Sequence, residues 1–198
     1  EVARLREGLS DSVLLVIDAA YAEYVRREGY SDGIALVDRY DNVVVTRTFS
    51  KIFGLASLRL GWLYGPSKVV DALNRIRCPF NANGAAQAAG MAALKDVAFV
   101  EAAVAHNEQW RPWLEKELGG LGLTVHPSIA NFVLIEFERS PLSQSAARAY
   151  DYLLQILVIG RELRGYNLPN CLRFSVGLEE DNRLLVDLIA KFIGPSRR

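Results

Sequence analysis

Three short apolar runs mark the first third of the chain. They cover residues 12–18 (SVLLVID), 42–50 (NVVVTRTFS) and 60–65 (LGWLYG). None of them alternates regularly between apolar and polar positions, a pattern typical of strands that are buried on both faces of a parallel sheet flanked by helices. The segments 21–40 and 67–76 have helical potential. The first half of the chain therefore predicts part of an α/β domain with a mainly parallel sheet.

The pattern changes in the second half, where helices come first and strands follow. Residues 83–96 and 97–118 are strongly helical, and we expect Pro112 to kink or restart the second of these helices. The elements predicted beyond them are two strands around a turn within 123–137, a helix at 143–155, a strand at 171–177 and an amphipathic helix that ends at Gly194. We expect a small α+β domain over residues 106–198, after a larger domain that ends near residue 105.

Composition excludes several classes of protein. The 198 residues are 51% hydrophobic and 23% charged, and 23 basic residues balance 23 acidic ones. No global field therefore favours binding to nucleic acid or to an anionic membrane. No apolar run approaches the roughly 20 residues that cross a bilayer, and no secretory signal opens the chain. These features favour a protein of the cytoplasm.

The cysteines and histidines show no metal-binding pattern along the chain. Cys78 and Cys171 lie far apart, and neither has a second cysteine at metal-type spacing. His106 and His126 are isolated, and we interpret both as ordinary polar residues. Two cysteines so far apart in the sequence fit a reducing compartment, and we expect no metal site.

The first residues of the chain already follow the apolar spacing of an amphipathic helix. Val2, Leu5 and Leu9 follow one another at helical spacing from the first residues, and there is no initial Met. Three buried strands with few covering helices cannot close a doubly wound domain by themselves. We expect the chain to be an N-terminally truncated portion of a longer protein, and to be catalytically incomplete alone.

Two charged residues occupy positions where α/β proteins bind ligands. Asp18 ends the first predicted strand and Lys51 follows the second, and ligands of open parallel sheets bind beyond the carboxyl ends of the strands. A lysine amine can form a Schiff base with an aldehyde, and an aspartate can pair with a protonated ring nitrogen. A pyridoxal phosphate site requires both features.

Other side chains nearby suit the same cofactor. The Tyr21 hydroxyl can donate a hydrogen bond to a phenolic oxygen. A phosphate can be bound by the hydroxyls of Thr48 and Ser50 and by the planar guanidinium of Arg59. A plain structural interpretation stays open at this point. Asp18 would then cap a helix, Lys51 would be a solvated loop residue, and Arg59 would form a surface ion pair.

Recognisable motifs favour the cofactor site. The chain contains DAAY at residues 18–21 and TFSKIFGLASLRLGW at 48–62, followed by PFNANGAAQAA, NFVLIEF and GYNLPNCLRFSVGLEEDNR. In this order the motifs resemble the fold-type I pyridoxal-phosphate aminotransferases, and among them most closely the histidinol-phosphate aminotransferases. The resemblance implies pyridoxal 5'-phosphate as the cofactor. It also implies that residues 1–105 are the C-terminal part of the large cofactor-binding domain.

The resemblance assigns a role to each candidate residue. Lys51 is then the Schiff-base lysine and the proton carrier, while Asp18 pairs with the pyridine nitrogen and Tyr21 binds the phenolic oxygen. The phosphate ligands are Thr48, Ser50 and Arg59. Arg173 matches the arginine that grips the α-carboxylate or the phosphate of the substrate. Arg161 matches a second anion-binding arginine, although the neighbouring sequence (VIGREL) differs from the motif usual in the family.

The implied reaction is transamination of L-histidinol phosphate with 2-oxoglutarate by a homodimer. Two other activities share the lysine segment, namely aromatic amino-acid transamination and threonine-phosphate decarboxylation. A non-catalytic remnant that only binds ligand or dimerises is a further alternative, as is an aminotransferase-like domain of a DNA-bound regulator. The set of Asp18, Tyr21, Lys51 and Arg59 argues against a remnant.

Overall fold

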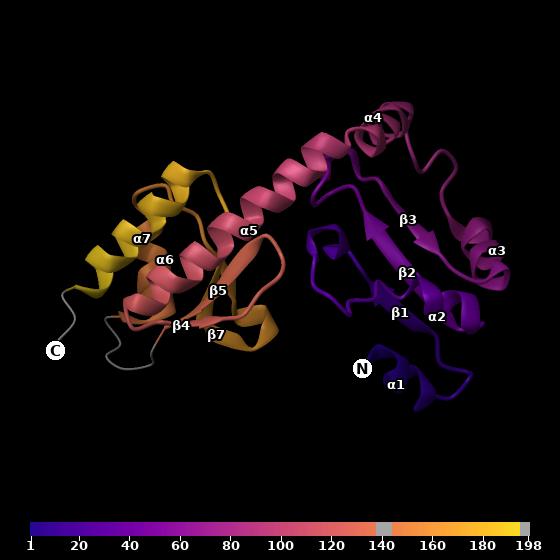
Figure 1. Cartoon of the computed structure of the whole chain (residues 1–198), viewed down its shortest axis with the longest axis horizontal. Coiled ribbons are helices and arrows are strands. Elements are labelled where there is room, and N and C mark those ends of the chain that lie inside the picture. Colours follow the sequence, from indigo (N-terminus) through magenta and orange to yellow (C-terminus); the bar gives the residue numbers. More distant parts are fainter. Residues whose placement is uncertain (138–143, 195–198) are drawn as a thin grey trace. The chain divides into compact units, whose positions relative to one another are not determined.

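The computed structural model describes residues 1–137 and 144–194, in which the chain forms two compact units, Glu1–Val104 and Ala105–Arg198 (Figure 1). Each unit has its own sheet and its own hydrophobic core. The identity of these parts as a large cofactor-binding domain and a small domain stays a prediction.

The first unit is built on a three-stranded sheet in the order β1-β2-β3. Its strands are β1 (Leu15–Asp18), β2 (Val43–Thr48) and β3 (Gly61–Tyr64). β2 lies in the middle, and its first three valines are almost completely buried. β1 runs parallel to β2, as the apolar runs predicted, whereas β3 runs antiparallel. The chain reverses through the loop 49–60, where the amide of Phe49 donates to the carbonyl of Leu60 at 3.0 Å.

Short helices surround this sheet. They are α1 (Val2–Glu7), η1 (Ala22–Tyr24), α2 (Ile34–Arg39), η2 (Ala56–Leu58), α3 (Ser67–Ile76) and α4 (Gly84–Lys95). The helical potential of residues 21–40 is realised only in η1 and α2. Gly29 and Gly33 have φ angles of 75° and 88°, a left-handed conformation that interrupts a helix and that glycine adopts readily. Asn83 caps α4 by accepting from the amide of Ala86 at 2.9 Å.

The second unit is a four-stranded antiparallel sheet in the order β4-β5-β7-β6, combined with helices. Its elements are β4 (Thr124–His126), β5 (Phe132–Glu136), α6 (Ala146–Leu154), β6 (Arg161–Leu163), η4 (Arg164–Tyr166), β7 (Leu168–Ser175) and α7 (Glu179–Ile193). Ser143, where the predicted helix starts, lies outside the described residues. Alternation along β5 sends Val133 and Ile135 into the core, where Leu172 and Phe174 of β7 join them. The opposite face of the same strands carries the polar residues considered below.

Helix α5 (Val97–Gly120) is the longest helix of the described residues and is continuous through Pro112. We predicted that Pro112 would kink the helix or start a new one. The structure shows one helix, so the prediction of a new helix was wrong. Proline removes one backbone hydrogen bond, and the burial of Trp110, Leu114 and Leu118 on either side of it offsets that loss. Within residues 1–137 and 144–194, no helix combines the length and the apolar character needed to cross a membrane.

Candidate functional site

The carboxyl ends of β1 and β2 lie at the same edge of the first sheet. Asp18, the last residue of β1, pairs in register with Thr46 of β2. The Thr46 hydroxyl donates to the Asp18 carboxylate at 3.4 Å, and the Asp18 side chain is otherwise open to solvent. A carboxylate is thereby held at the sheet edge where parallel strands place ligands.

The loop after β2 presents Lys51 from a fixed backbone. Phe49 and Ile52, on either side of Lys51 in the sequence, are buried. The amide of Leu55 donates to the carbonyl of Phe49 at 3.0 Å, and that of Gly54 donates to the carbonyl of Lys51 at 2.9 Å. Lys51 itself is exposed. The loop therefore anchors its apolar side chains and leaves the lysine amine accessible.

The amine of Lys51 lies above Tyr21. The distance from Lys51 Nζ to the centre of the Tyr21 ring is 5.1 Å, within the range of a cation–π contact. A small apolar cluster holds the two segments together, because Tyr24 packs with Ile52 and Val104. Burial raises the pKa of Tyr24, and the neighbouring Tyr21 and Glu23 raise it further. Tyr24 therefore stays neutral and packs as part of this cluster.

Ser50, which precedes Lys51, is in contact with Arg59 from the far end of the same loop. Arg59 Nη1 donates to Ser50 Oγ at 3.2 Å and to the carbonyl of Ala56 at 2.8 Å. No carboxylate of the described residues forms an ion pair with Arg59. A guanidinium beside a hydroxyl, without an acidic partner, is a donor set suited to a phosphate.

Arg59 also has an unusual backbone. Its φ angle of 53° places it in the left-handed region, which costs a residue with a Cβ atom about 1 kcal/mol. Such strain persists where the surrounding structure over-determines it, and it is enriched at ligand sites. Here the loop closure between Phe49 and Leu60 and the bonds of the guanidinium both fix the conformation.

Thr48 has a structural task in this loop. Its hydroxyl accepts from the amide of Ser50 at 3.0 Å and donates to the carbonyl of Leu60 at 3.5 Å. These bonds shape the turn into the lysine loop. Its role as a phosphate ligand stays a prediction.

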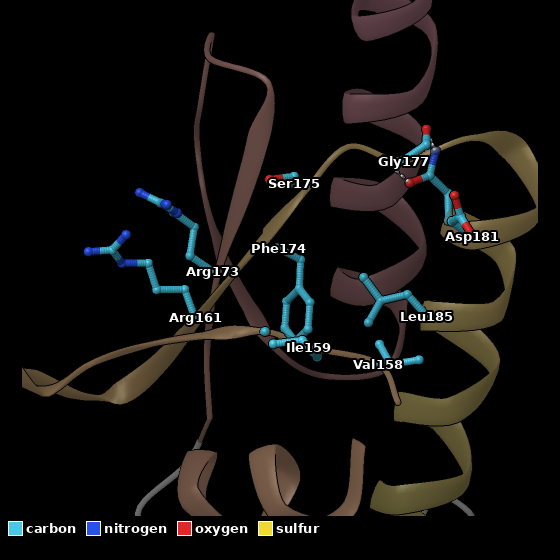
Figure 2. Close-up of a pocket in the computed structure, with 11 residues that line it drawn as sticks. Val158, Ile159, Arg161, Arg173, Phe174, Ser175, Gly177, Asp181 and Leu185 are labelled. Atoms are coloured by element: carbon cyan, nitrogen blue, oxygen red, sulfur yellow. Dashed lines mark hydrogen bonds between the residues drawn. The ribbon is translucent and has the colours of Figure 1, made fainter. Parts of the chain in front are cut away.

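The two arginines singled out in the second half lie together in the second unit. Arg161 of β6 and Arg173 of β7 are direct cross-strand partners. Figure 2 shows both side chains extending to the same side, away from Phe174 and Leu185. They line a cavity of about 320 Å³. Arg173 lies 4.8 Å above the ring of Phe132, and Arg161 contacts the Tyr166 hydroxyl at 3.4 Å.

Within the described parts of the chain, neither of these arginines forms an ion pair. Like charges that face each other across two strands repel, and the repulsion destabilises the pair. A bound anion would relieve it. The arrangement therefore favours a ligand that carries a carboxylate or phosphate.

The neighbourhood of the cavity contains a histidine that we interpreted as an ordinary polar residue. His106 Nε2 lies 2.8 Å from the carbonyl of Gly177. Asn182, which is buried, receives a bond from the amide of Gly177 and donates one to its carbonyl, both at 2.9 Å. These contacts fix the turn between β7 and α7, close to the arginine pair.

Comparison with known proteins places the chain in a family. The model of the family described as aminotransferase class I and II matches residues 6–189. The chain belongs to this aminotransferase family.

Two curated relatives of this chain are named histidinol-phosphate aminotransferase. Those from Rhodopseudomonas palustris (strain BisB18) and Maricaulis maris (strain MCS10) are each 52% identical over 193 residues, which is 98% of this chain and 53% of each relative. The chain thus spans about half the length of the curated relatives it matches.

Among solved structures, the chain is similar to a histidinol-phosphate aminotransferase from Sinorhizobium meliloti in complex with pyridoxal-5'-phosphate. The TM-score is 0.84 at 27% identity, and the match covers 97% of this chain and 52% of that one. The fold expected from the resemblance is confirmed.

Sequence reasoning missed one residue that supports the candidate site, Arg47. Its guanidinium donates to Glu23 at 2.7 Å and to Asp32 at 2.6 Å, and only 11% of its side chain is exposed. Glu23 follows Tyr21 by two residues, and Asp32 precedes α2. Arg47 therefore ties both turns to the strand that leads to Lys51. The signal that could have revealed Arg47 is its charge, because it lies inside the apolar run 42–50.

Replacing Arg47 tests this anchoring. We expect Arg47→Met to lower the free energy of unfolding by about 3 kcal/mol, because it leaves two partly buried carboxylates without their partner. Arg26→Met is the matched control, since it removes the exposed ion pair with Glu101 and should cost at most about 1 kcal/mol. Urea denaturation followed by circular dichroism measures both values. Equal losses in the two variants would contradict an anchoring role for Arg47.

Proposed function

We propose that this chain carries the lysine-bearing part of a pyridoxal 5'-phosphate-dependent aminotransferase that transfers the amino group of L-histidinol phosphate to 2-oxoglutarate. The observation that carries the proposal is the lysine loop, in which an exposed Lys51 approaches Tyr21 and a Ser50–Arg59 pair lies nearby in the sequence. The names of the curated relatives at 52% identity support the choice of substrate.

The donors present in the first unit match the groups of pyridoxal 5'-phosphate in chemistry. Ser50 and Arg59 would hold the phosphate, with Thr48 as a further hydroxyl. Tyr21 would donate to the phenolic oxygen, Asp18 would pair with the ring nitrogen, and Lys51 would attach to the aldehyde carbon. When bound, the cofactor supplies an electron sink for the carbanion that forms as the substrate loses its α-proton.

Each of these residues then has a defined task. The Asp18 carboxylate, which accepts from the Thr46 hydroxyl, would favour the protonated form of the ring nitrogen. The Lys51 amine would move the proton at the α-carbon of the substrate, acting as a general base and then as a general acid. The anchored loop fixes the position of that amine, which proton transfer over hydrogen-bond distance requires.

The arginine pair of the second unit would bind the substrate. Arg173 is planar and can grip a carboxylate or phosphate through two parallel bonds, and Arg161 adds a second positive charge beside it. L-histidinol phosphate and 2-oxoglutarate both carry anionic groups, so one arginine pair can serve both halves of the reaction. The absence of an ion pair to either arginine within the described residues leaves the pair available for this task.

The proposal includes a homodimer in the cytoplasm. The resemblance to fold-type I enzymes supports the dimer, because those enzymes form their sites at the dimer interface. Two large apolar side chains are also exposed, Ile76 (78%) at the end of α3 and Phe80 (95%) in the segment that follows. Exposed apolar side chains of this size suit a protein interface.

The substrate is tested on the purified product of the complete gene, loaded with pyridoxal 5'-phosphate and 2-oxoglutarate. We expect glutamate formation from L-histidinol phosphate with a kcat/KM at least about 100-fold above that for L-phenylalanine. Lys51→Ala should abolish it, whereas Lys68→Ala, on the exposed side of α3, should retain it. Preference for L-phenylalanine would indicate an aromatic aminotransferase, and carbon dioxide release from O-phospho-L-threonine a decarboxylase. No turnover with any donor would indicate a non-catalytic protein.

Removing the charge of Arg173 tests the substrate site. Arg173→Gln should raise the KM for both the amino donor and 2-oxoglutarate at least about tenfold, because charged hydrogen bonds contribute about 1.5–3 kcal/mol. Arg148→Gln, on the exposed surface of α6, is the matched control and should leave both values unchanged. Steady-state kinetics with each substrate varied in turn gives the result. An unchanged KM for both substrates in Arg173→Gln would contradict the assignment.

A further inference from the structure

Three side chains with different donor atoms meet on one face of the second sheet. They are His126 at the end of β4, Glu136 at the end of β5, and Cys171 in β7. Glu136 and Cys171 are direct cross-strand partners. His126 pairs with Leu134, two residues before Glu136, so alternation along the strand puts it on the same face.

The donor atoms of this His126–Glu136–Cys171 cluster are close enough to share a ligand. All of them lie within 4.8 Å of one another, and His126 Nε2 is 3.0 Å from a Glu136 carboxylate oxygen. In tetrahedral zinc sites the donor atoms stand about 3.3–3.7 Å apart, as bonds of about 2.0–2.3 Å to one metal require. His126 and Glu136 are each 43% exposed, so their side chains can rotate to close the remaining gap.

The donor atoms of the cluster indicate which class of metal ion it can bind. Imidazole nitrogen, thiolate sulfur and carboxylate oxygen are the three ligand types of zinc, whereas calcium and magnesium take oxygen ligands alone. Cys171 is buried and fixed in the central part of the sheet, while the other two ligands border solvent. A cation can therefore enter from the solvent side and keep a water molecule as its fourth ligand.

Two contributions oppose binding and one favours it. Burial raises the pKa of the Cys171 thiol, with Glu136 adding to the effect, so the metal has to displace a proton. The existing bond between His126 and Glu136 has to rearrange. Against these costs, three ligands on neighbouring strands of one sheet are already brought together by the fold, so little ordering is needed.

We propose that the His126–Glu136–Cys171 cluster binds one divalent cation of the zinc class through an imidazole nitrogen, a carboxylate oxygen and a thiolate. The site is independent of the proposed aminotransferase activity, because it uses none of its residues. Cys171 and Arg173 alternate onto the same face of β7, so the metal would lie on the face that carries the arginine pair. Spacing along the chain does not reveal this site, since the three ligands are 10 and 35 residues apart.

Titration of the reduced chain with Co²⁺ and Zn²⁺, without added cofactor, tests the proposal. We expect one equivalent of Co²⁺ to produce the thiolate-to-cobalt charge-transfer band, and Zn²⁺ to displace it. Cys171→Ser should abolish the band and weaken Zn²⁺ binding, measured by calorimetry, at least about tenfold. Cys78→Ser, which removes the exposed cysteine of the first unit, is the matched control and should change neither.

A second variant covers the case in which the buried Cys171→Ser substitution unfolds the unit. His126→Gln alters a half-exposed side chain, so the fold should persist by circular dichroism while Zn²⁺ binding weakens at least about tenfold. Three outcomes overturn the proposal. They are a charge-transfer band that is lost in Cys78→Ser, unchanged Zn²⁺ binding in His126→Gln, and no saturable binding by the unaltered chain.

Discussion

β1 and β2 lie side by side in a parallel register that pairs Asp18 with Thr46, and the candidate cofactor site depends on this pairing. The buried valines of β2 hold the register, because a slip of one residue would turn their side chains to the other face of the sheet. The same register brings a carboxylate to the edge from which the lysine loop departs. Arg47 adds a polar anchor by tying two turns between β1 and α2 to β2.

In both units, three arginines form no ion pair with any carboxylate of residues 1–137 and 144–194, for different structural reasons. Arg59 is aimed by a left-handed backbone and by bonds to Ser50 and to a loop carbonyl. Arg161 and Arg173 are aimed by strand pairing, which forces two like charges together. Each arrangement lowers the stability of the fold, and a bound anion would offset that loss by neutralising the positive charge. Such locally unfavourable arrangements are expected at binding sites.

The sequence predicted the features that depend on local pattern. The apolar runs gave the strands of the first unit, and the motif NFVLIEF gave β5, whose Val133 and Ile135 are buried as expected. Features that depend on contacts between distant residues escaped prediction. The antiparallel direction of β3 depends on closure of the loop 49–60, and the three-residue strand β6, which contains two charged residues, shows no apolar run.

The same limit applies to the candidate site. The position of Lys51 after a strand was visible in the sequence, but the two ion pairs of Arg47 join residues 15 and 24 positions away. The turn-forming bonds of Thr48 were likewise invisible, because a hydroxyl beside a serine looks the same whether it binds a ligand or shapes a loop. Spacing along the sequence reveals sets of ligand residues that lie within one helix, strand or loop. Sets that strand pairing brings together from distant parts of the chain cannot be seen in this way.

The central claim is that Lys51 is the residue that carries the cofactor. Borohydride reduction in the presence of pyridoxal 5'-phosphate, followed by peptide mapping, tests it most directly on this chain and on the product of the complete gene. The account predicts a phosphopyridoxyl group on Lys51 in the longer protein, and label on Lys51 in the shorter chain as well if its own residues suffice for the pocket. Absence of label from Lys51 in both proteins would contradict the account.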